Sequence, residues 1–465
     1  MENCDSGFDV AIVGAGIAGS ALAAYLAKSN LKILLIEKDW SEQERIVGEL
    51  LQPGGVQILN QMELSHCLEG FDAQPVYGYA IFKQNEYFTI TYPKIKGEEN
   101  LFGRGFKNGK FLQRLRGAAL SNPKVSSVEG EAKELIIEGD TVRGVRVILK
   151  RDNSTVNYYA KLTVICDGIF SGFRNQLCSA EKKVSGFFLG IILKECQLPF
   201  PFHGHVFTGG KTPFLAYPIS STEIRMLIDF PGEQAPRRGP ELNNFLMQEV
   251  YSQLPETLKE PFIKALSEGH IKNMPNHYLP AKPLRKHGVV MLGDSLNMRH
   301  PLTGGGMTVA LTDTKLLGDL LMRLDTESKM HEPYINKSIE LYYQTRPERD
   351  ATINILANAL YQVFSHQALR DACFYYLKQG GIYAEQPLAL LSAISRNRKL
   401  LLKHFFAVAA FGAKHNFTGN PSLSSLKQSY SMIGDAVKIV HPLIKNENPN
   451  NIERLALWVG RKVFA

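Results

Sequence analysis

The sequence predicts an α/β protein in which a sheet assembled from separate stretches of the chain is interleaved with a second sheet and followed by helices. Residues 8–37 read as strand, glycine turn, helix and strand, and residues 289–320 read as strand, glycine run and helix. Between them, residues 75–104 and 184–230 contain alternating patterns typical of half-buried strands. The two glycine units indicate a layered α/β architecture, and the alternating stretches form the inserted sheet.

The amino-terminal unit carries the fingerprint of a dinucleotide-binding domain. Its first strand, residues 8–13, leads into a turn with glycines at the three required positions, which are Gly14, Gly16 and Gly19. A helix through Ala27 and a strand over residues 32–36 follow, and that strand is followed by Glu37, 21 residues after the second glycine. The first glycine makes the tight turn, the second lets a pyrophosphate approach, the third lets helix and strand pack, and the acid binds ribose hydroxyls. Residues 10–27 carry no charge, but the glycines and the preceding strand argue against a membrane span.

The second unit combines a strand, a carboxylate, glycines and a helix. Four apolar residues, 289–292, precede Asp294, and a helix begins at Met307. Before that helix stand three successive glycines, Gly304, Gly305 and Gly306. The helix start offers free N–H groups and a positive dipole end, and the glycines let a flat ring system approach the backbone. Asp294 is then placed to accept hydrogen bonds from the hydroxyls of a sugar-like chain.

Composition narrows the possible functions. A chain of 465 residues with 44% hydrophobic and 21% charged residues is ordinary for a globular protein and long enough for two or three domains. The net charge of +8 is mild, and no basic run with interleaved aromatic residues points to nucleic acid. The six cysteines lack metal-type CxxC spacing and the amino terminus lacks a signal peptide pattern, so we expect a reduced intracellular protein with no metal site.

The segments between the two glycine units complete the predicted domain organisation. Residues 45–55 place Arg45 and Glu49 four residues apart before a Pro-Gly-Gly turn, which suits either a surface ion pair or a functional segment. A helix is expected over residues 109–119, and residues 162–174 repeat the strand-and-carboxylate pattern. We expect residues 1–75, 105–180 and 280–325 in the dinucleotide domain, residues 76–104 and 181–279 in the second sheet domain, and residues 326–465 in a helical region.

Several motifs resemble a known family. The segments GAGIAGS, DGIFSGFR and GDSLNMRHPLTGGGM occur in the order found in flavoprotein monooxygenases of the para-hydroxybenzoate hydroxylase type. The segments RIVGELLQPGG and NMRHPLTGGGMTVALTD resemble the squalene epoxidase family in particular. The resemblance implies a Rossmann-type FAD-binding domain of the glutathione reductase and para-hydroxybenzoate hydroxylase kind, interleaved with a β-sheet substrate domain, and a C-terminal helical, membrane-associated region. One departure is Gly172, which stands where the FSxFR motif leads us to expect a basic residue.

The resemblance implies FAD as the tightly bound cofactor. Besides the glycines, the family's FAD contacts fall on Ile17, Ala18, Glu37, Lys38, Arg45, Arg116, Ala132, Asp294 and Met307. The implied reaction converts squalene to (S)-2,3-oxidosqualene with O2 through a flavin C4a-hydroperoxide, and it needs no side-chain nucleophile. The dipole of the helix after the triple glycine would stabilise the anionic reduced flavin.

The resemblance also places residues around the substrate. Tyr79 matches a family tyrosine that lines the active site near Glu49, and we expect these two to form a polar pair beside the flavin; alternatively, Tyr79 is a packed strand aromatic. Positions that match the family's substrate or inhibitor cavity are Phe364, Phe374, Leu377, Pro387, Leu390 and His404. We expect the apolar segments 400–413 and 452–463 to insert into one leaflet of a membrane, the alternative being that they are core.

The resemblance finally implies partners and a cellular place. Squalene and O2 would be the substrates, and NADPH–cytochrome P450 reductase would supply electrons. Membrane lipid would hold the chain on the cytoplasmic face of the endoplasmic reticulum, or on lipid droplets, in sterol biosynthesis. Three alternatives stay open: an FAD monooxygenase of another lipid or quinone precursor, a prenyl-chain reductase that needs no oxygen, and a non-catalytic escort of prenylated proteins, which would purify without flavin colour.

Overall fold

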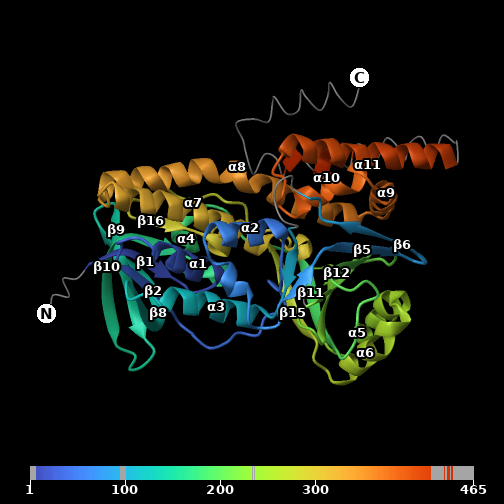
Figure 1. Cartoon of the computed structure of the whole chain (residues 1–465), viewed down its shortest axis with the longest axis horizontal. Coiled ribbons are helices and arrows are strands. Elements are labelled where there is room, and N and C mark those ends of the chain that lie inside the picture. Colours follow the sequence, from blue (N-terminus) through green and yellow to red (C-terminus); the bar gives the residue numbers. More distant parts are fainter. Residues whose placement is uncertain are drawn as a thin grey trace.

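The computed structural model has two sheets side by side, and long helices are laid across one side of them (Figure 1). It describes residues 7–94, 101–232, 234, 236–419, 434, 437–439 and 441–442. The first sheet lies toward the amino terminus, and helices near the carboxyl end of the described chain cover the second (Figure 1). The arrangement leaves two places for ligands, one at the edge of the first sheet and one between the second sheet and the helices.

The first sheet has the parallel order expected of a dinucleotide-binding unit. Its parallel strands, in spatial order, are β8 (Val125–Glu138), β2 (Ile33–Glu37), β1 (Phe8–Val13), β10 (Thr155–Ile165) and β16 (Val289–Met291). The long strands β8 and β10 also extend beyond this sheet and pair antiparallel with β9 (Thr141–Leu149). Because helices and loops cover both faces, the central strands are apolar almost throughout. The predicted strands at 8–13, 32–36 and 289–292 are confirmed to within a residue.

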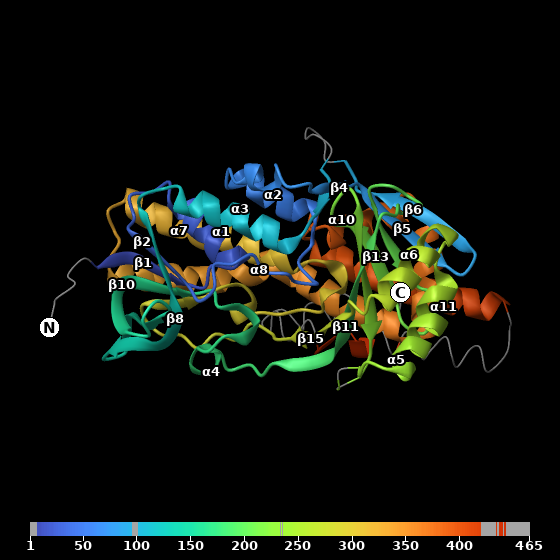
Figure 2. The same cartoon turned by 90° about the horizontal axis from the view of Figure 1, so that it is seen from below.

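Helices pack on this sheet and frame the carboxyl ends of its strands, the region we call the cleft. The helices that pack together there are α1 (Ile17–Leu26), α3 (Asn108–Leu120) and α7 (Gly306–Thr326). Two shorter ones, α2 (Pro53–Gln61) and α4 (Arg174–Leu177), lie on opposite edges of the molecule (Figure 2). The predicted helices at 109–119 and after the triple glycine are confirmed.

The second sheet joins strands from two distant stretches of sequence. Its order is β15 (Lys272–Tyr278), β11 (Lys183–Lys194), β14 (Glu223–Phe230), β13 (Phe214–Pro218), β12 (His203–Phe207), β5 (Gly78–Lys83) and β6 (Glu86–Thr91). The parallel pairing of β12 with β5 is the join between the two stretches. Helices α5 (Pro240–Phe245) and α6 (Glu256–Ser267) pack on the sheet, and a small sheet of β3 (Leu50–Leu51), β7 (Gly103–Gly105) and β4 (Gln74–Val76) connects it to the first unit.

Helices form the rest of the described chain. They are α8 (Glu332–Ser365), α9 (Gln367–Lys378), α10 (Ile382–Leu391) and α11 (Arg398–Gly419). Among the described helices, none combines the length and the apolar character needed to cross a bilayer. Segment 400–413 lies in α11, and its residues Leu401, Leu402, Phe406 and Ala409 are buried in the protein, so the expectation that its apolar residues face lipid is wrong for these four. Segment 452–463 lies outside the described residues.

Candidate functional site

The turn after β1 has the geometry that a dinucleotide requires. Gly14 has a φ of +98°, and a Cβ there would lie 2.5 Å from the carbonyl oxygen of Cys166. A Cβ on Gly19 would lie 2.0 Å from the Gly14 carbonyl oxygen, so a side chain would push α1 off the turn. A Cβ on Gly16, by contrast, would meet no atom within 4 Å. Two glycines therefore allow the turn and its packing, and the third leaves open space at the start of α1, where phosphate groups bind free N–H groups.

The acid that ends β2 faces this turn. The Glu37 carboxylate accepts hydrogen bonds from the backbone N–H of Ala15 at 2.7 Å and of Asp39 at 3.1 Å. Arg116 is buried in α3, donates its Nε to the Ala15 carbonyl at 2.9 Å, and stacks over the Trp40 ring at 5.2 Å. The guanidinium of Arg116 thus binds protein carbonyls and also lies 3.6 Å from the Glu37 carboxylate, which it holds where a ribose would bind.

Other residues expected to contact FAD lie around the same cleft. They are Ile17 and Ala18 at the start of α1, Lys38 just after β2, Arg45 on the loop that follows, and Ala132 on β8. Lys38 and Arg45 are exposed, and Ala132 is half-buried. Ala132 follows Glu129, the β8 partner of Glu37, by three residues, so it lies beyond the carboxyl end of β2.

The carboxylate after β16 is free to bind a ligand. Asp294 is exposed on the turn Gly293–Ser295, and its side chain makes no hydrogen bond within the described part of the chain. Surrounding protein raises the pKa of Asp294, while the positive charge of Arg299 and other arginines opposes that shift. Arg174 donates to the Asp294 carbonyl at 3.1 Å and to the Gly168 carbonyl at 2.8 Å. This arginine therefore ties the two strand-and-carboxylate turns together beneath the cleft.

The triple glycine leads into α7 through a second open position. Gly304 has a φ of +62°, and a Cβ on Gly305 would lie 2.6 Å from Cγ2 of Ile353. A Cβ on Gly306, the first residue of α7, would meet nothing within 4 Å. The sulfur of the buried Met307 lies 3.8 Å from where a Cβ on Gly48 would stand, so the 45–49 segment runs beside this helix start.

These features fit FAD. Open backbone at Gly16 suits the pyrophosphate, the free Asp294 carboxylate suits the ribityl hydroxyls, and open backbone at Gly306 suits the flat ring. In the described residues, no group of three or more histidine, cysteine, aspartate and glutamate side chains could hold a metal ion.

A buried glutamine joins the triple-glycine loop to the second sheet. Gln52, at the start of α2, donates its Nε2 to the Tyr79 hydroxyl at 2.7 Å and to the Thr303 carbonyl at 2.8 Å. Its Oε1 accepts a hydrogen bond from the Tyr92 hydroxyl at 2.8 Å. Because Thr303 directly precedes the glycines, one side chain connects Tyr79 to the backbone where the flat ring of FAD would lie.

The expected polar pair of Glu49 and Tyr79 is wrong. Glu49 instead forms a bidentate ion pair with Arg225 on β14, at 2.6 Å to Nε and 3.0 Å to the terminal nitrogen. Both residues are 2% exposed, so the interpretation of Glu49 as half of a surface pair with Arg45 is also wrong. Burial alone lowers the pKa of Arg225, but the hydrogen bonds and charge of Glu49 outweigh it and raise the pKa above its usual value. The pair locks the 45–49 segment onto the second sheet.

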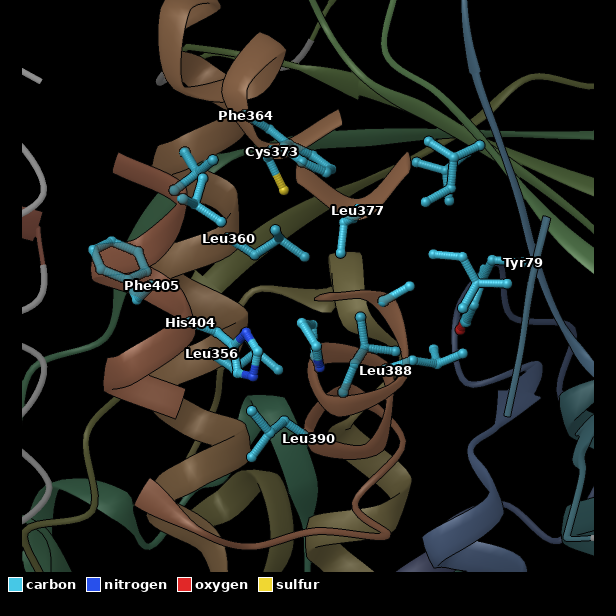
Figure 3. A pocket seen from close by; sticks show the side chains of 18 of the residues that line it. Tyr79, Leu356, Leu360, Phe364, Cys373, Leu377, Leu388, Leu390, His404 and Phe405 are labelled. Atoms are coloured by element: carbon cyan, nitrogen blue, oxygen red, sulfur yellow. The ribbon is translucent and has the colours of Figure 1, made fainter. Parts of the chain in front are cut away.

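An apolar cavity lies between the second sheet and the C-terminal helices (Figure 3). Its volume is about 150 Å³. Tyr79 and His404 bring polar groups to otherwise aliphatic and aromatic walls, from opposite sides in Figure 3. Residues expected around a substrate that line it are Tyr79, Phe364, Leu377, Pro387, Leu390 and His404.

Phe374 does not line the cavity, contrary to expectation. Successive residues of a helix point about 100° apart, so Cys373 faces the cavity while Phe374 faces elsewhere. The Phe374 ring packs against Phe88 of β6 at 5.1 Å and lies 5.8 Å from the Lys83 ammonium. It therefore supports α9 against the sheet from outside the substrate space.

His404 is held by two polar neighbours. Its Nε2 lies 2.7 Å from the amide oxygen of Gln386 and its Nδ1 lies 2.8 Å from the Tyr376 hydroxyl. Because the amide oxygen can only accept, Nε2 carries the proton and Nδ1 accepts from the tyrosine. Burial lowers the pKa of His404 to about 4, so it is neutral at physiological pH. The three residues fasten α9, α10 and α11 to one another beside the cavity.

A buried charge cluster supports the triple-glycine loop. Arg346 on α8 pairs with Asp313 on α7 at 2.7 Å and with Asp350 at 3.3 Å. Arg346 also donates to the Asn297 side chain at 2.9 Å, and Arg299 binds the same side-chain oxygen at 2.7 Å. Arg299 in turn donates to the carbonyl of the third loop glycine at 3.3 Å. The position of the loop therefore depends on charges buried between α7 and α8.

We expect Tyr79→Phe to slow turnover or to increase hydrogen peroxide released per NADPH, without loss of bound FAD. The change removes an acceptor of the buried Gln52 amide, and an unsatisfied buried donor costs about 1–3 kcal/mol. Steady-state kinetics with a peroxide assay measures it. Tyr77→Phe is the matched control, because Tyr77 is exposed and lies outside this network. Unchanged turnover and coupling in Tyr79→Phe would reduce Tyr79 to a packing residue.

Sequence reasoning missed several residues that build the site: Gln52, Arg174, Arg225 and Arg299. A signal exists for two of them. Gln52 is polar between Leu51 and Pro53 in an otherwise apolar motif, and Arg225 is charged in the apolar strand EIRMLIDF. A charged residue at an inward strand position predicts a buried partner but does not identify it.

Comparison with known sequence families finds two matches. A family model described as squalene epoxidase matches residues 159–430, and one described as FAD dependent oxidoreductase matches residues 9–66. The second match covers the fingerprint turn and Glu37, and the first covers strands β11 to β15 of the second sheet, the triple glycine and the cavity helices.

Similar curated proteins come from plants, mammals and yeast. Squalene epoxidase 2, mitochondrial, of Arabidopsis thaliana is 43% identical over 450 residues, which are 95% of this chain and 76% of that protein. Squalene monooxygenase of Mus musculus is 39% identical over 94% of this chain and 78% of its own length. The squalene epoxidase of Schizosaccharomyces pombe is 36% identical over 89% of this chain and 92% of its own length.

Solved structures with a similar fold include flavin enzymes of other kinds. Klebsiella pneumoniae HpxO, solved with FAD and uric acid, superposes with a TM-score of 0.64 at 17% identity over 83% of this chain and 97% of its own. The flavin-dependent brominase Bmp2 superposes with a TM-score of 0.69 at 15% identity over 88% of this chain and 100% of its own. At these identities the likeness concerns the fold alone.

Proposed function

The chain belongs to the squalene epoxidase family, and we propose that its FAD cleft and its apolar cavity together form the active site of that family's reaction. The chain is an FAD-dependent monooxygenase that converts squalene to 2,3-oxidosqualene with O2. A quinone-precursor monooxygenase and a prenyl-protein escort fit these relatives less well than a squalene epoxidase does.

One observation carries the assignment of the site. The cavity wall at Tyr79 is bonded through Gln52 to the Thr303 carbonyl, directly before the triple glycine. A hydrocarbon has no polar group to bind, so shape and apolar burial, at roughly 25 cal/mol per Å², must place it. A cavity with almost wholly apolar walls that reaches the loop beside the flavin does this.

The residues of this chain bind, orient and exclude water. Bound FAD would supply the chemistry of the reaction, the activation of O2 for oxygen insertion into an alkene. Asp294 and the backbone at Gly16 and Gly306 hold it, while Gln52 fixes the loop against the cavity. The apolar walls keep the reacting end of squalene dry, which suppresses loss of the oxygen as peroxide.

A direct assay tests the proposed function. Purified protein with bound FAD is incubated with squalene, O2, NADPH and NADPH–cytochrome P450 reductase, and the epoxide is quantified. Formation of 2,3-oxidosqualene is expected, and none should form when the cavity is blocked by Leu377→Trp, which puts a bulky ring into its wall. Equal turnover in that variant would place the substrate elsewhere.

We expect Asp294→Ala to weaken FAD binding by roughly 10- to 100-fold. Its free carboxylate is the expected partner of the ribityl hydroxyls, and hydrogen bonds to charged acceptors contribute about 1.5–3 kcal/mol. Glu37→Ala should have an effect of similar size through the ribose. Flavin fluorescence titration of the apoprotein gives the dissociation constants, with Glu241→Ala, an exposed carboxylate on α5, as the control. A wild-type dissociation constant in either variant would reject that residue's assignment.

The electron donor and the membrane contact complete the proposal. We infer that electrons come from NADPH through cytochrome P450 reductase and that the chain sits on the cytoplasmic face of the endoplasmic reticulum membrane or on lipid droplets. Family membership supports the first inference. The second rests on the sequence of residues 452–463, whose apolar positions recur at helical spacing beside Arg454 and Arg461, with Trp458 among them.

Truncation before Ile452 is expected to reduce binding to lipid vesicles and to leave the FAD spectrum intact. The removed segment has the pattern of an interfacial helix and lies outside the part of the sequence that forms the FAD cleft. Vesicle flotation of full-length and truncated protein measures the effect. Equal flotation of the two would remove this segment as the anchor.

A further inference from the structure

An exposed aromatic residue stands beside the FAD cleft and is used by nothing in the mechanism. Phe170 is 77% exposed on the turn that joins β10 to α4. A single exposed aromatic residue is common on protein surfaces, so Phe170 is informative only together with the charges beside it. We define the basic rim as Phe170 with Lys182, Lys183 and Lys282, all of them exposed.

The rim is tied rigidly to the cleft. The Asp167 carboxylate accepts a hydrogen bond from the backbone N–H of Gly172 at 3.0 Å, which closes the turn around Phe170. Arg174 then binds the Ile169 carbonyl at 3.0 Å and the Asp294 carbonyl at 3.1 Å. The buried side chain of Arg174 therefore connects the turn that carries Phe170 to Asp294, the expected partner of the ribityl chain.

The exposed charges of the rim are mostly positive, since three lysines stand against one exposed carboxylate, Glu181, which precedes Lys182. The Lys182 ammonium lies 5.5 Å from the Phe170 ring and 3.4 Å from the Ile169 carbonyl. The Lys282 backbone is placed beside the end of α4 by its carbonyl, which accepts from the Ser179 N–H at 2.9 Å. Within the described chain, none of the three rim lysines pairs with a carboxylate. Arg285, which lies nearby in sequence, already pairs with Glu340 at 3.0 Å and is not counted.

We propose that the basic rim docks the acidic face of the electron-donor protein, a surface of carboxylates around its own redox group. The inference rests on the proposed supply of electrons by a separate protein. Such a donor must approach FAD closely, bind briefly and leave, and complementary charges speed encounter without requiring a large interface. The lysines of the rim provide the charges, and Phe170 provides the aromatic anchor.

The position of the rim separates it from the cavity helices. Figure 2 shows α4, next to the rim, on the edge of the molecule opposite α2 and away from the end where α11 lies. A protein bound there would reach the FAD cleft without blocking the helices around the cavity. An anionic membrane surface is the other possible occupant of an aromatic-and-lysine patch, and this position favours the donor protein.

Charge reversal is the first test. The double change Lys182→Glu and Lys282→Glu should raise the KM for NADPH–cytochrome P450 reductase by roughly tenfold, since like charges would then face each other, and should weaken the dependence of that KM on salt. The FAD spectrum and the rate of flavin reduction by dithionite should not change. Lys32→Glu with Lys337→Glu is the matched control, because both lysines are exposed and neither belongs to the rim.

A gain of charge is the second test, and it carries little risk of misfolding. A Cβ on Gly172 would meet no atom within 4 Å, and the residue does not have a left-handed φ. Gly172→Lys therefore adds a positive charge two residues from Phe170, and the KM for the reductase should fall several-fold at low salt.

The possible results distinguish the docking surface from the proposed electron donor on which it rests. If the wild-type enzyme makes epoxide with the reductase and neither rim variant alters the KM, the inference is wrong while the proposed donor stands. If the wild-type enzyme works with a chemical reductant but not with the reductase, both the donor and its docking surface are wrong. If charge reversal lowers binding to phosphatidylserine vesicles and leaves the reductase KM unchanged, the rim is a membrane contact instead.

Discussion

Replacement of Glu49 by alanine is expected to lower the free energy of unfolding by about 3–5 kcal/mol, because it leaves a buried guanidinium without its counter-charge. Arg225 is 2% exposed, and both of its hydrogen bonds to a side chain end on Glu49, at 2.6 and 3.0 Å. Urea denaturation of the FAD-bound protein measures the loss. Arg225→Ala should cost a similar amount, since it strands the carboxylate.

The double variant Glu49→Met and Arg225→Met is the control for this prediction. Buried ion pairs replaced by apolar side chains of similar volume often keep their stability or gain some, so the double variant should be far more stable than either single one. The double variant should still bind FAD more weakly than the wild type, because the ion pair aligns the 45–49 segment beside Met307. A single variant that loses less than about 1 kcal/mol would show that the pair behaves like an exposed one.

The sequence predicts correctly those parts of the fold and of the site that are determined by residues close together in the chain. The fingerprint turn requires strand, glycines, helix and acid at fixed spacing, and each of its residues lies where the pattern puts it. The triple glycine before α7 is of the same kind. Cavity residues such as Leu377 and His404 came from the family resemblance, and they line one space because the helices that carry them pack face to face.

The errors concern partners that only the folded chain brings together. Glu49 and Arg225 are 176 residues apart, and their contact depends on which face of β14 the arginine occupies and on how the second sheet docks. Tyr79 was expected to meet Glu49, yet Gln52, three residues further along the same motif, takes the tyrosine. Phe374 was expected in the cavity, but its neighbour Cys373 faces the cavity and Phe374 faces the sheet. Adjacent residues of a helix point in different directions, so an error of one residue changes the predicted surroundings of a side chain.

The mostly apolar segment 400–413 shows a second limit. An apolar helix face has the same composition whether it meets lipid or core, and only the packing of its neighbours distinguishes the two. Here α9 and α10 cover residues such as Leu402 and Ala409, so the face is core.

Replacement of Arg346 by methionine is expected to cost about 3–5 kcal/mol of unfolding free energy, because it removes the positive charge between Asp313 and Asp350. The two carboxylates lie 2.7 and 3.3 Å from the Arg346 Nε and are almost wholly buried. Burial and the negative charge of Asp313 already raise the pKa of Asp350 well above its usual value, and Arg346 opposes that rise. Without the arginine, the pKa of Asp350 in the folded state rises further.

The raised pKa of Asp350 determines how the stability of Arg346→Met depends on pH. A carboxyl whose folded-state pKa is raised favours folding at low pH, and that stability is lost as pH rises from its unfolded pKa, ~3.9, through the folded value. The deficit of Arg346→Met relative to wild type should therefore be larger at pH 8 than at pH 5. Urea denaturation at pH 5 and pH 8 measures this deficit, with Arg349→Met as the neighbouring control. The double variant Arg346→Met and Asp350→Asn should recover stability at pH 8. FAD affinity should fall with stability, since Arg346 supports the triple-glycine loop through Asn297 and Arg299. A deficit that shrinks as pH rises would mean that the carboxylates are not held together as a charged cluster.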